Sequence, residues 1–189
     1  MIQLLKGLPH SFPLPVIVVQ HMMPEFTRSL AQRFNDHVPL SVSEAVPGKL
    51  LEPGHVLVAP GGRHLSVSSR WRVRILSDPP RHGVRPSVDV TLETAAPIFG
   101  ERMLAVILTG MGRDGALGCQ QVKAHGGTVW VQDEASSVVF GMPKAVIELQ
   151  AADRVLPLDT IAHQMDRWAS RLILRSADAR GVGDDDWST

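Results

Sequence analysis

The sequence has little that would commit it to the cell exterior, a membrane or a nucleic acid. It contains one cysteine, Cys119, so no disulfide can form within the chain and no thiol pair is present for zinc or redox chemistry. Its 19 basic and 19 acidic residues cancel, which argues against charge-driven binding to nucleic acid. The longest apolar runs, such as residues 16–19, are far shorter than the roughly 18 to 20 residues that span a bilayer. The N-terminus also lacks the pattern of a signal peptide, so we expect a soluble, cytoplasmic protein with no membrane insertion.

What the sequence does contain is a pattern of short apolar runs that alternate with longer amphipathic stretches. This pattern is typical of a parallel α/β sheet, whose strands are buried on both faces. We predict strands at residues 16–20, 55–59, 104–109 and 128–132, and helices at residues 24–34, 88–96, 116–124 and 161–174. At 189 residues and 44% hydrophobic content the chain suits one core. The expected fold is a three-layer, doubly wound α/β domain with a mainly parallel sheet.

Two segments depart from this alternation. Residues 65–75 alternate polar and apolar side chains around Ser68-Ser69-Arg70, which predicts an antiparallel hairpin appended to the sheet. Residues 176–189 are polar, end near three consecutive aspartates and have little to bury. We therefore expect a domain over residues 1–175 and a flexible tail over residues 176–189.

Chemistry is expected where polar residues follow the strands, because open parallel sheets bind ligands beyond the carboxyl ends of their strands. His21 directly follows the first predicted strand, and the loop at residues 109–115 follows the third. A carboxylate in that loop, Asp114, is suited to orienting a histidine on a neighbouring strand end. Backbone N–H groups near Met111 and Gly112 are suited to stabilising a tetrahedral anion. None of the eight histidines has the i, i+4 spacing with glutamate of a zinc helix, so we expect no metal.

An alternative function comes from the same loop. Gly110 to Gly115 fits the G-x-G-x-x-G pattern of dinucleotide-binding proteins, and Asp133 follows the next predicted strand. However, Asp114 would place a carboxylate in the turn that should hold an anionic pyrophosphate. A dinucleotide-dependent oxidoreductase is thus a remote alternative, and it predicts saturable dinucleotide binding that the substitution Asp133→Ala weakens.

Five ordered motifs resemble those of a known family. They are Gln20-His21-Met22, Ala59-Pro60-Gly61, Arg85-Pro86-Ser87-Val88-Asp89, the loop at residues 109–116, and Glu134-Ala135-Ser136 followed by Phe140-Gly141-Met142-Pro143. Together they closely resemble the catalytic domain of the chemotaxis-receptor protein-glutamate methylesterases of the CheB type, over about residues 14–165. The resemblance implies a Ser-His-Asp hydrolase that needs no cofactor. It cleaves methyl esters of glutamate side chains, and deamidates glutamines, on the helices of chemotaxis receptors.

The resemblance also implies roles for individual residues. It makes His21 the general base, Asp114 the carboxylate that orients it, and the Met111 backbone N–H part of the oxyanion hole. Residues of the remaining motifs are expected to line the substrate cleft, and these are Arg85, Ser87, Asp89, Glu134 and Met142. Each also has an ordinary structural interpretation, in helix capping for Ser87 and Glu134 and in core packing for Met142.

The sequence departs from the family at the nucleophile. In the family a serine stands in a glycine-rich turn roughly two dozen residues before the histidine, whereas only 20 residues precede His21 and no G-x-S-x-G motif occurs. Residues 1–7 are typical of the end of the helix that follows such a turn, so we expect the first strand and the serine to lie upstream of Met1. The other candidate serines, Ser11, Ser87, Ser136 and Ser137, are expected to serve as caps or turn residues.

This chain is therefore expected to have little or no esterase activity by itself. A start placed too late and a decayed copy of the enzyme both explain the pattern. A catalytically silent receptor-binding module is the main alternative function. The expected partners are the receptor helices and, in intact family members, a phospho-receiver domain that these residues do not include.

Overall fold

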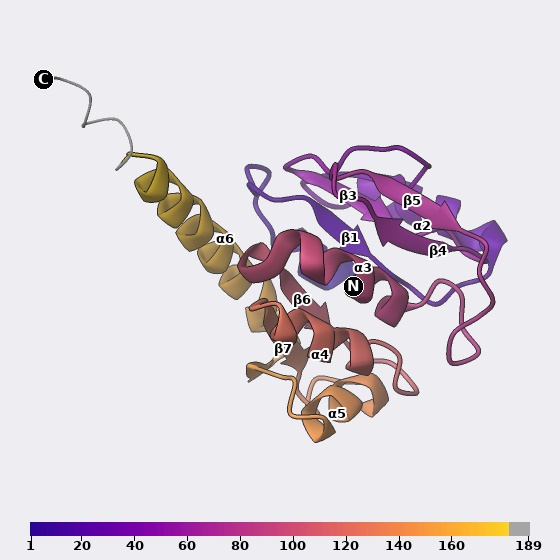
Figure 1. Cartoon of the computed structure of the whole chain (residues 1–189). Helices are drawn as coiled ribbons and strands as arrows, with labels where there is room; N and C mark the ends of the chain where they lie inside the picture. The colour runs from indigo at the N-terminus through magenta and orange to yellow at the C-terminus, as the bar shows by residue number, and fades with distance from the viewer. Residues whose placement is uncertain (182–189) are drawn as a thin grey trace, which may run out of the picture.

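The apolar runs of the sequence form two parallel sheets of three strands each (Figure 1). The computed structural model describes the backbone of residues 1–181 and the side chains of residues 1–175. One sheet has the order β1 (Val16–Val18), β3 (His55–Val58), β2 (Ser41–Glu44). The other has the order β6 (Leu104–Ile107), β7 (Thr128–Gln132), β8 (Arg154–Leu156). The four predicted strands are thus confirmed as β1, β3, β6 and β7.

Helices connect and cover these strands. They are α1 (Ile2–Lys6), α2 (Pro24–Asn35), α3 (Val88–Phe99), α4 (Ala116–Ala124), α5 (Gly141–Glu148) and α6 (Leu158–Gly181), with a short 3₁₀ helix at Gly100–Arg102. Pro24 stands at the first turn of α2, where its missing N–H costs no hydrogen bond. The predicted helices are confirmed as α2, α3, α4 and α6.

The two parallel sheets act as one layer, because their side chains alternate between the same two helical layers. Val16 and Val18 of β1 pack in a cluster with residues of α1, α2 and α6, and Leu104 and Val106 of β6 pack against that cluster. Ala105 and Ile107 of β6 face the opposite side, with α3, α4 and α5. The three-layer α/β fold predicted from the sequence is confirmed. Within the described residues, β1 pairs with β3 alone and β6 pairs with β7 alone.

The predicted hairpin is present as β4 (His64–Val67) and β5 (Val73–Leu76), which pair antiparallel. It forms a separate two-stranded sheet and joins the domain by packing. Leu65 and Val73 are fully buried against Leu57 of β3 and Ala95 of α3. The hairpin and α3 therefore cover one face of the β1 sheet.

The predicted boundary between the domain and the tail, at residues 175 and 176, falls within the last helix. Helix α6 begins at Leu158 and continues to Gly181, so the predicted flexible tail would start inside a helix. Figure 1 shows α6 leading away from the body of the molecule. The rest of the predicted tail, residues 182–189, lies outside the described residues. No helix in the described part of the chain is long and apolar enough to cross a membrane.

The starts of α3 and α4 lie against each other, and a glycine makes this approach possible. Gly115, which precedes α4, has a φ of 92°, a left-handed conformation that side chains disfavour. A Cβ added to Gly115 would lie 2.8 Å from Cγ1 of Val88, the first residue of α3. This contact brings the loop after β6 to the N-terminus of α3.

Candidate active site

His21 and Asp114 come together at the carboxyl ends of two parallel strands, as the sequence predicts. His21 follows β1 and Asp114 follows β6, and the His21 Nε2 lies 2.7 Å from the Asp114 Oδ2. The His21 side chain is 25% exposed, whereas that of Asp114 is 3% exposed. Since a carboxylate only accepts hydrogen bonds, the histidine donates from Nε2. The Nδ1 atom of His21 then carries the lone pair that can take a proton.

Asp114 is held by the first turn of α3. The Ser87 hydroxyl donates to Oδ1 at 2.6 Å, the Val88 N–H donates to Oδ2 at 2.7 Å, and the Asp89 N–H donates to Oδ1 at 3.1 Å. Ser87 occupies the N-cap position of α3, yet its hydroxyl donates to Asp114. Asp114 therefore caps α3 from another segment of the chain, where the helix dipole favours a negative charge.

These contacts keep Asp114 ionised in a buried place. Burial by itself raises the pKa of the Asp114 carboxyl. The hydrogen bonds from His21, Ser87 and the two backbone N–H groups outweigh burial and lower this pKa from 3.8 to about 2. A carboxylate that stays charged and fixed is suited to orienting an imidazole and to stabilising its protonated form.

The loop that carries Met111 is anchored on both sides by backbone hydrogen bonds of Gly110. The Gly110 N–H donates to the Val139 carbonyl, and the Gly110 carbonyl accepts from Gly141 and Met142. The Met111 side chain is 83% exposed, and within the described residues its N–H has no hydrogen-bond partner. Met142 is buried and packs directly beneath Gly110, so it supports the loop from the core side.

The other residues expected in the substrate cleft have different surroundings. Ser87 and Asp89 are fully buried, so they lie beneath Asp114 and do not line an open cleft. The guanidinium of Arg85, which is partly buried, donates to the carbonyls of Ser77 and Asp78. Glu134 is exposed in the loop after β7.

The remaining serines expected in caps or turns do not reach His21. The Ser136 hydroxyl donates to Asp133 and accepts from the Leu158 N–H at 3.0 Å. The Ser137 hydroxyl donates to the Asp133 carbonyl. Among the described residues, no serine hydroxyl is hydrogen-bonded to His21. In the described part of the chain, His21 is therefore paired with Asp114 and with no serine hydroxyl.

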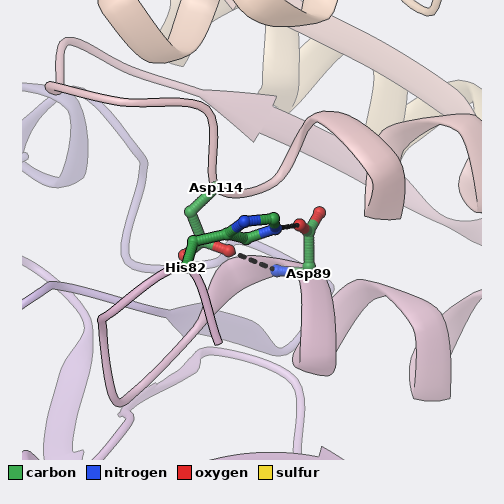
Figure 2. Close-up of side chains that lie close together, drawn as sticks. All are labelled: His82, Asp89 and Asp114. Carbon is green, nitrogen blue, oxygen red and sulfur yellow. Dashed lines mark hydrogen bonds and ion pairs between the residues drawn. The ribbon is translucent and has the colours of Figure 1, made fainter. Parts of the chain in front are cut away.

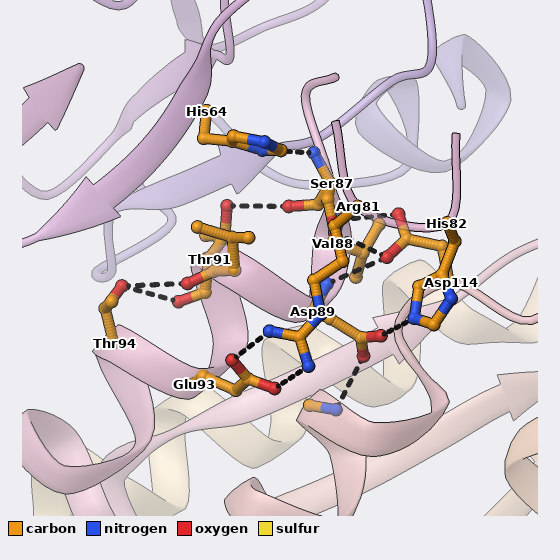
Figure 3. A network of polar contacts seen from close by, with 12 residues as sticks. His64, Arg81, His82, Ser87, Val88, Asp89, Thr91, Glu93, Thr94 and Asp114 are labelled. Carbon is orange, nitrogen blue, oxygen red and sulfur yellow. Dashed lines mark hydrogen bonds and ion pairs between the residues drawn. The ribbon is translucent and has the colours of Figure 1, made fainter. Parts of the chain in front are cut away.

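Two further histidines belong to the network around α3. His64 is a secondary candidate that follows the Ala59-Pro60-Gly61 motif, whereas His82 belongs to none of the motifs. Figure 3 shows His64 beside Ser87, where the His64 Nδ1 accepts from the Ser87 N–H at 3.2 Å. His82 lies on the other side and contacts Asp89 through Nε2 at 2.9 Å. The contact between His82 and Asp89 arises from the packing of the loop before α3, which the spacing of these residues in the sequence does not indicate.

Three ligand-type side chains meet at this place, namely His82, Asp89 and Asp114, whose atoms lie within 4.8 Å of one another (Figure 2). Each oxygen of Asp114 already accepts two hydrogen bonds. Each oxygen of Asp89 accepts one, from Gly118 or His82. A cation would have to displace several of these donors, so the donor set fits a hydrogen-bonded cluster better than a metal centre.

The geometry does not favour the dinucleotide alternative. The start of α4, where a pyrophosphate would bind, is occupied by the Asp89 carboxylate, which accepts the Gly118 N–H at 2.6 Å. The Asp133 carboxylate accepts hydrogen bonds from the backbone N–H and the hydroxyl of Ser136, in the turn that follows β7. A bound pyrophosphate would therefore face carboxylates at this helix N-terminus.

Comparisons with known proteins identify relatives of this chain. Residues 1–165 match the CheB methylesterase family. The chain is 49% identical over 165 residues to a protein-glutamate methylesterase/protein-glutamine glutaminase of Symbiobacterium thermophilum, covering 87% of this chain and 46% of that protein. It is 43% identical over 163 residues to a protein of the same name from Pseudomonas savastanoi pv. phaseolicola, covering 86% of this chain and 42% of that protein. The chain thus spans less than half the length of these relatives.

A solved structure gives the same result for the fold. The crystal structure of the Thermotoga maritima CheB methylesterase catalytic domain superposes with a TM-score of 0.84 at 44% identity. The match covers 88% of this chain and 90% of that domain. The shared fold, the paired His21 and Asp114 and the match over residues 1–165 lead to one conclusion: this chain belongs to the CheB methylesterase family.

Proposed function

We propose that this chain is the catalytic part of a protein-glutamate methylesterase and glutamine deamidase that acts on chemotaxis receptors. The observation that carries the proposal is the hydrogen bond between His21 and Asp114 at the carboxyl ends of β1 and β6. Relatives that share 49% and 43% identity carry the name of this double activity. The fixed, ionised carboxylate supports the role of His21 as a general base.

The reaction would follow the order of a serine hydrolase. Nδ1 of His21 takes the proton of a serine hydroxyl while that oxygen attacks the ester carbonyl of the substrate glutamate. The Met111 N–H stabilises the negative oxygen of the tetrahedral intermediate. His21 returns the proton to the leaving oxygen, methanol departs, and water then cleaves the acyl-serine by the same steps. With glutamine as substrate the leaving group is ammonia.

Under this proposal the serine comes from a segment that the described residues do not include. A place for it is suggested by the two sheets, since β1 and β6 each have an edge with no strand partner in the described part of the chain. Both edges are flanked by the same two helical layers. A parallel strand paired with both edges would end between His21 and the Met111 loop, where a nucleophile is needed.

The receptor and the regulator are part of the same proposal. The family resemblance implies a cytoplasmic enzyme whose substrate is a long helical receptor, controlled by a phospho-receiver domain. Glu134 and Met111 are exposed in loops that follow β7 and β6, so they are available to contact such a helix. We propose Arg85 as a support of this cleft, because its head group ties the segment before α3 to the end of the hairpin.

The experiment that tests this function measures methanol release from a methylated receptor. The 189-residue chain is compared with a form extended upstream in its natural reading frame, each beside its His21→Ala variant. Release by the extended form alone, lost with His21→Ala, supports the proposal. Receptor binding by both forms without methanol release would instead support the silent binding module.

A further inference from the structure

We propose that Asp89, held by His82, is a positioning residue for the His21–Asp114 pair. The catalytic consequence of this inference rests on the proposed function, whereas the positioning itself concerns only atoms of this chain. The candidate is a second buried aspartate that the reaction does not use. It stands beside Asp114, and its side chain is fully buried (Figure 2).

The two aspartates clamp the starts of two helices reciprocally. Asp114, which precedes α4, accepts the N–H groups of Val88 and Asp89 at the start of α3. Asp89, in the first turn of α3, accepts the N–H of Gly118 in the first turn of α4 at 2.6 Å. Neither helix has a side-chain cap from its own N-cap residue. The first turn of α3 therefore depends on Asp114 for a hydrogen-bond acceptor, and the first turn of α4 depends on Asp89.

This clamp fixes more than the helices. The Asp89 carboxylate holds the first turn of α4, and the residues just before that turn are Asp114 and the loop with Met111. The Asp89 backbone N–H contacts the Asp114 Oδ1 at 3.1 Å. Loss of the clamp would let the loop shift against α3. Such a shift moves the orienting carboxylate and the oxyanion donor together.

His82 completes the arrangement from the solvent side. Its Nε2 donates to the Asp89 Oδ2 at 2.9 Å, while the Asp89 Oδ1 is taken by Gly118. The His82 backbone has a φ of 51° and lies between Arg81 and Val84, whose backbones hydrogen-bond to each other. A buried carboxylate oxygen without a donor is strongly unfavourable. His82 thus keeps Asp89 in the orientation in which it holds α4.

The test reads the tautomer of His21 by ¹⁵N NMR in the 189-residue chain, because that tautomer depends on the placement of Asp114. The wild-type ring is expected to carry its neutral proton on Nε2. In Asp89→Ala and His82→Ala the population protonated on Nδ1 should rise about fivefold, the effect of losing one net hydrogen bond. His82→Gln, which keeps a donor at a similar reach, should restore the wild-type tautomer.

Asp153→Ala is the matched control, since this aspartate also accepts a backbone N–H, that of Val129 at 2.8 Å, away from the site. It should lower stability and leave His21 unchanged. If Asp89→Ala does not fold, His82→Ala decides, because it removes the donor that orients Asp89 and keeps the Asp89 carboxylate itself. A wild-type tautomer in folded His82→Ala overturns the inference, and so does an equal change in Asp153→Ala.

In the serine-bearing extended form, His82→Ala should lower kcat about tenfold and leave KM within about twofold, as expected when an orienting contact is lost. If the extended form releases no methanol at all, the proposed function fails, while the NMR result on His21 still decides the positioning.

Discussion

At the scale of single residues, Asp114 makes two kinds of contact, because it caps α3 and accepts a hydrogen bond from His21. Four donors converge on its two oxygens, from His21, Ser87, Val88 and Asp89. The donors keep the carboxylate charged in a place where burial alone would favour its neutral form. Changes to any donor should therefore appear both in stability and in the titration of this carboxyl.

One such change is Ser87→Ala. The hydroxyl is buried and donates to Asp114 at 2.6 Å, so its loss leaves Oδ1 with the Asp89 N–H alone. We expect the free energy of unfolding to fall by about 1.5 to 3 kcal/mol, the range for hydrogen bonds to charged groups. The pKa of Asp114 should rise. Urea unfolding and NMR titration of the carboxyl measure the two effects.

Thr160→Ala serves as the control for Ser87→Ala, because the Thr160 hydroxyl donates to the Pro157 carbonyl at an exposed position. Its effect on stability should be small. Equal losses of stability in the two variants would show that the hydrogen bond from Ser87 to Asp114 does not stabilise the fold.

The lowered pKa of Asp114 also predicts how the free energy of unfolding depends on pH. Its pKa is about 2 in the folded chain and 3.8 ordinarily, so the folded state binds this proton less readily. The stabilisation is present above about pH 4 and is lost as pH falls toward about 2, and it amounts to at most about 2.5 kcal/mol. Asp114→Asn should lack this part of the pH dependence. Urea unfolding of both proteins at about pH 6 and about pH 3 measures it, and identical pH dependences would refute the prediction.

At the scale of elements, the close approach of α3 and α4 positions the site, and Gly115 allows it. Gly115→Ala places a methyl group against Val88 in a backbone conformation with φ 92°. We expect a loss of about 2 to 4 kcal/mol, from the left-handed backbone together with the displaced helix.

Gly48→Ala separates the cost of the left-handed backbone from the cost of the displaced helix. Gly48 has a φ of 80° and no atom within 4 Å of the added Cβ, so only the backbone effect remains. Thermal and urea unfolding of both variants give the difference. If the two substitutions destabilise equally, the contact between the helix starts is not tight.

Other elements show why parts of the fold escaped the sequence. The strand β2 has one buried residue in four, and β8 has one in three, so neither shows the apolar run on which strand prediction depends. Helix α5 begins with Gly141 and has Pro143 in its first turn, which weakens its helical pattern. These elements are specified by packing against neighbours that are distant in the sequence.

At the scale of the whole molecule, the sequence predicts the part of the site that follows from sheet topology. His21 and Asp114 each follow a strongly apolar strand, and parallel strands bring such positions to one edge. Asp89 and His82 could not be placed in this way, because their contacts arise from the packing of α3, α4 and the loop before α3. Periodicity describes which face of an element is apolar and says nothing about which polar groups will meet.

The central claim is that His21, oriented by Asp114, acts as the general base of a methylesterase. Its most direct test is the rate of methanol release from methylated receptor by the serine-bearing extended form, compared with that of its His21→Ala variant. We predict a fall in kcat of at least about a thousandfold, as for the loss of a triad histidine. A variant that keeps its rate within about tenfold of the wild type would contradict the account.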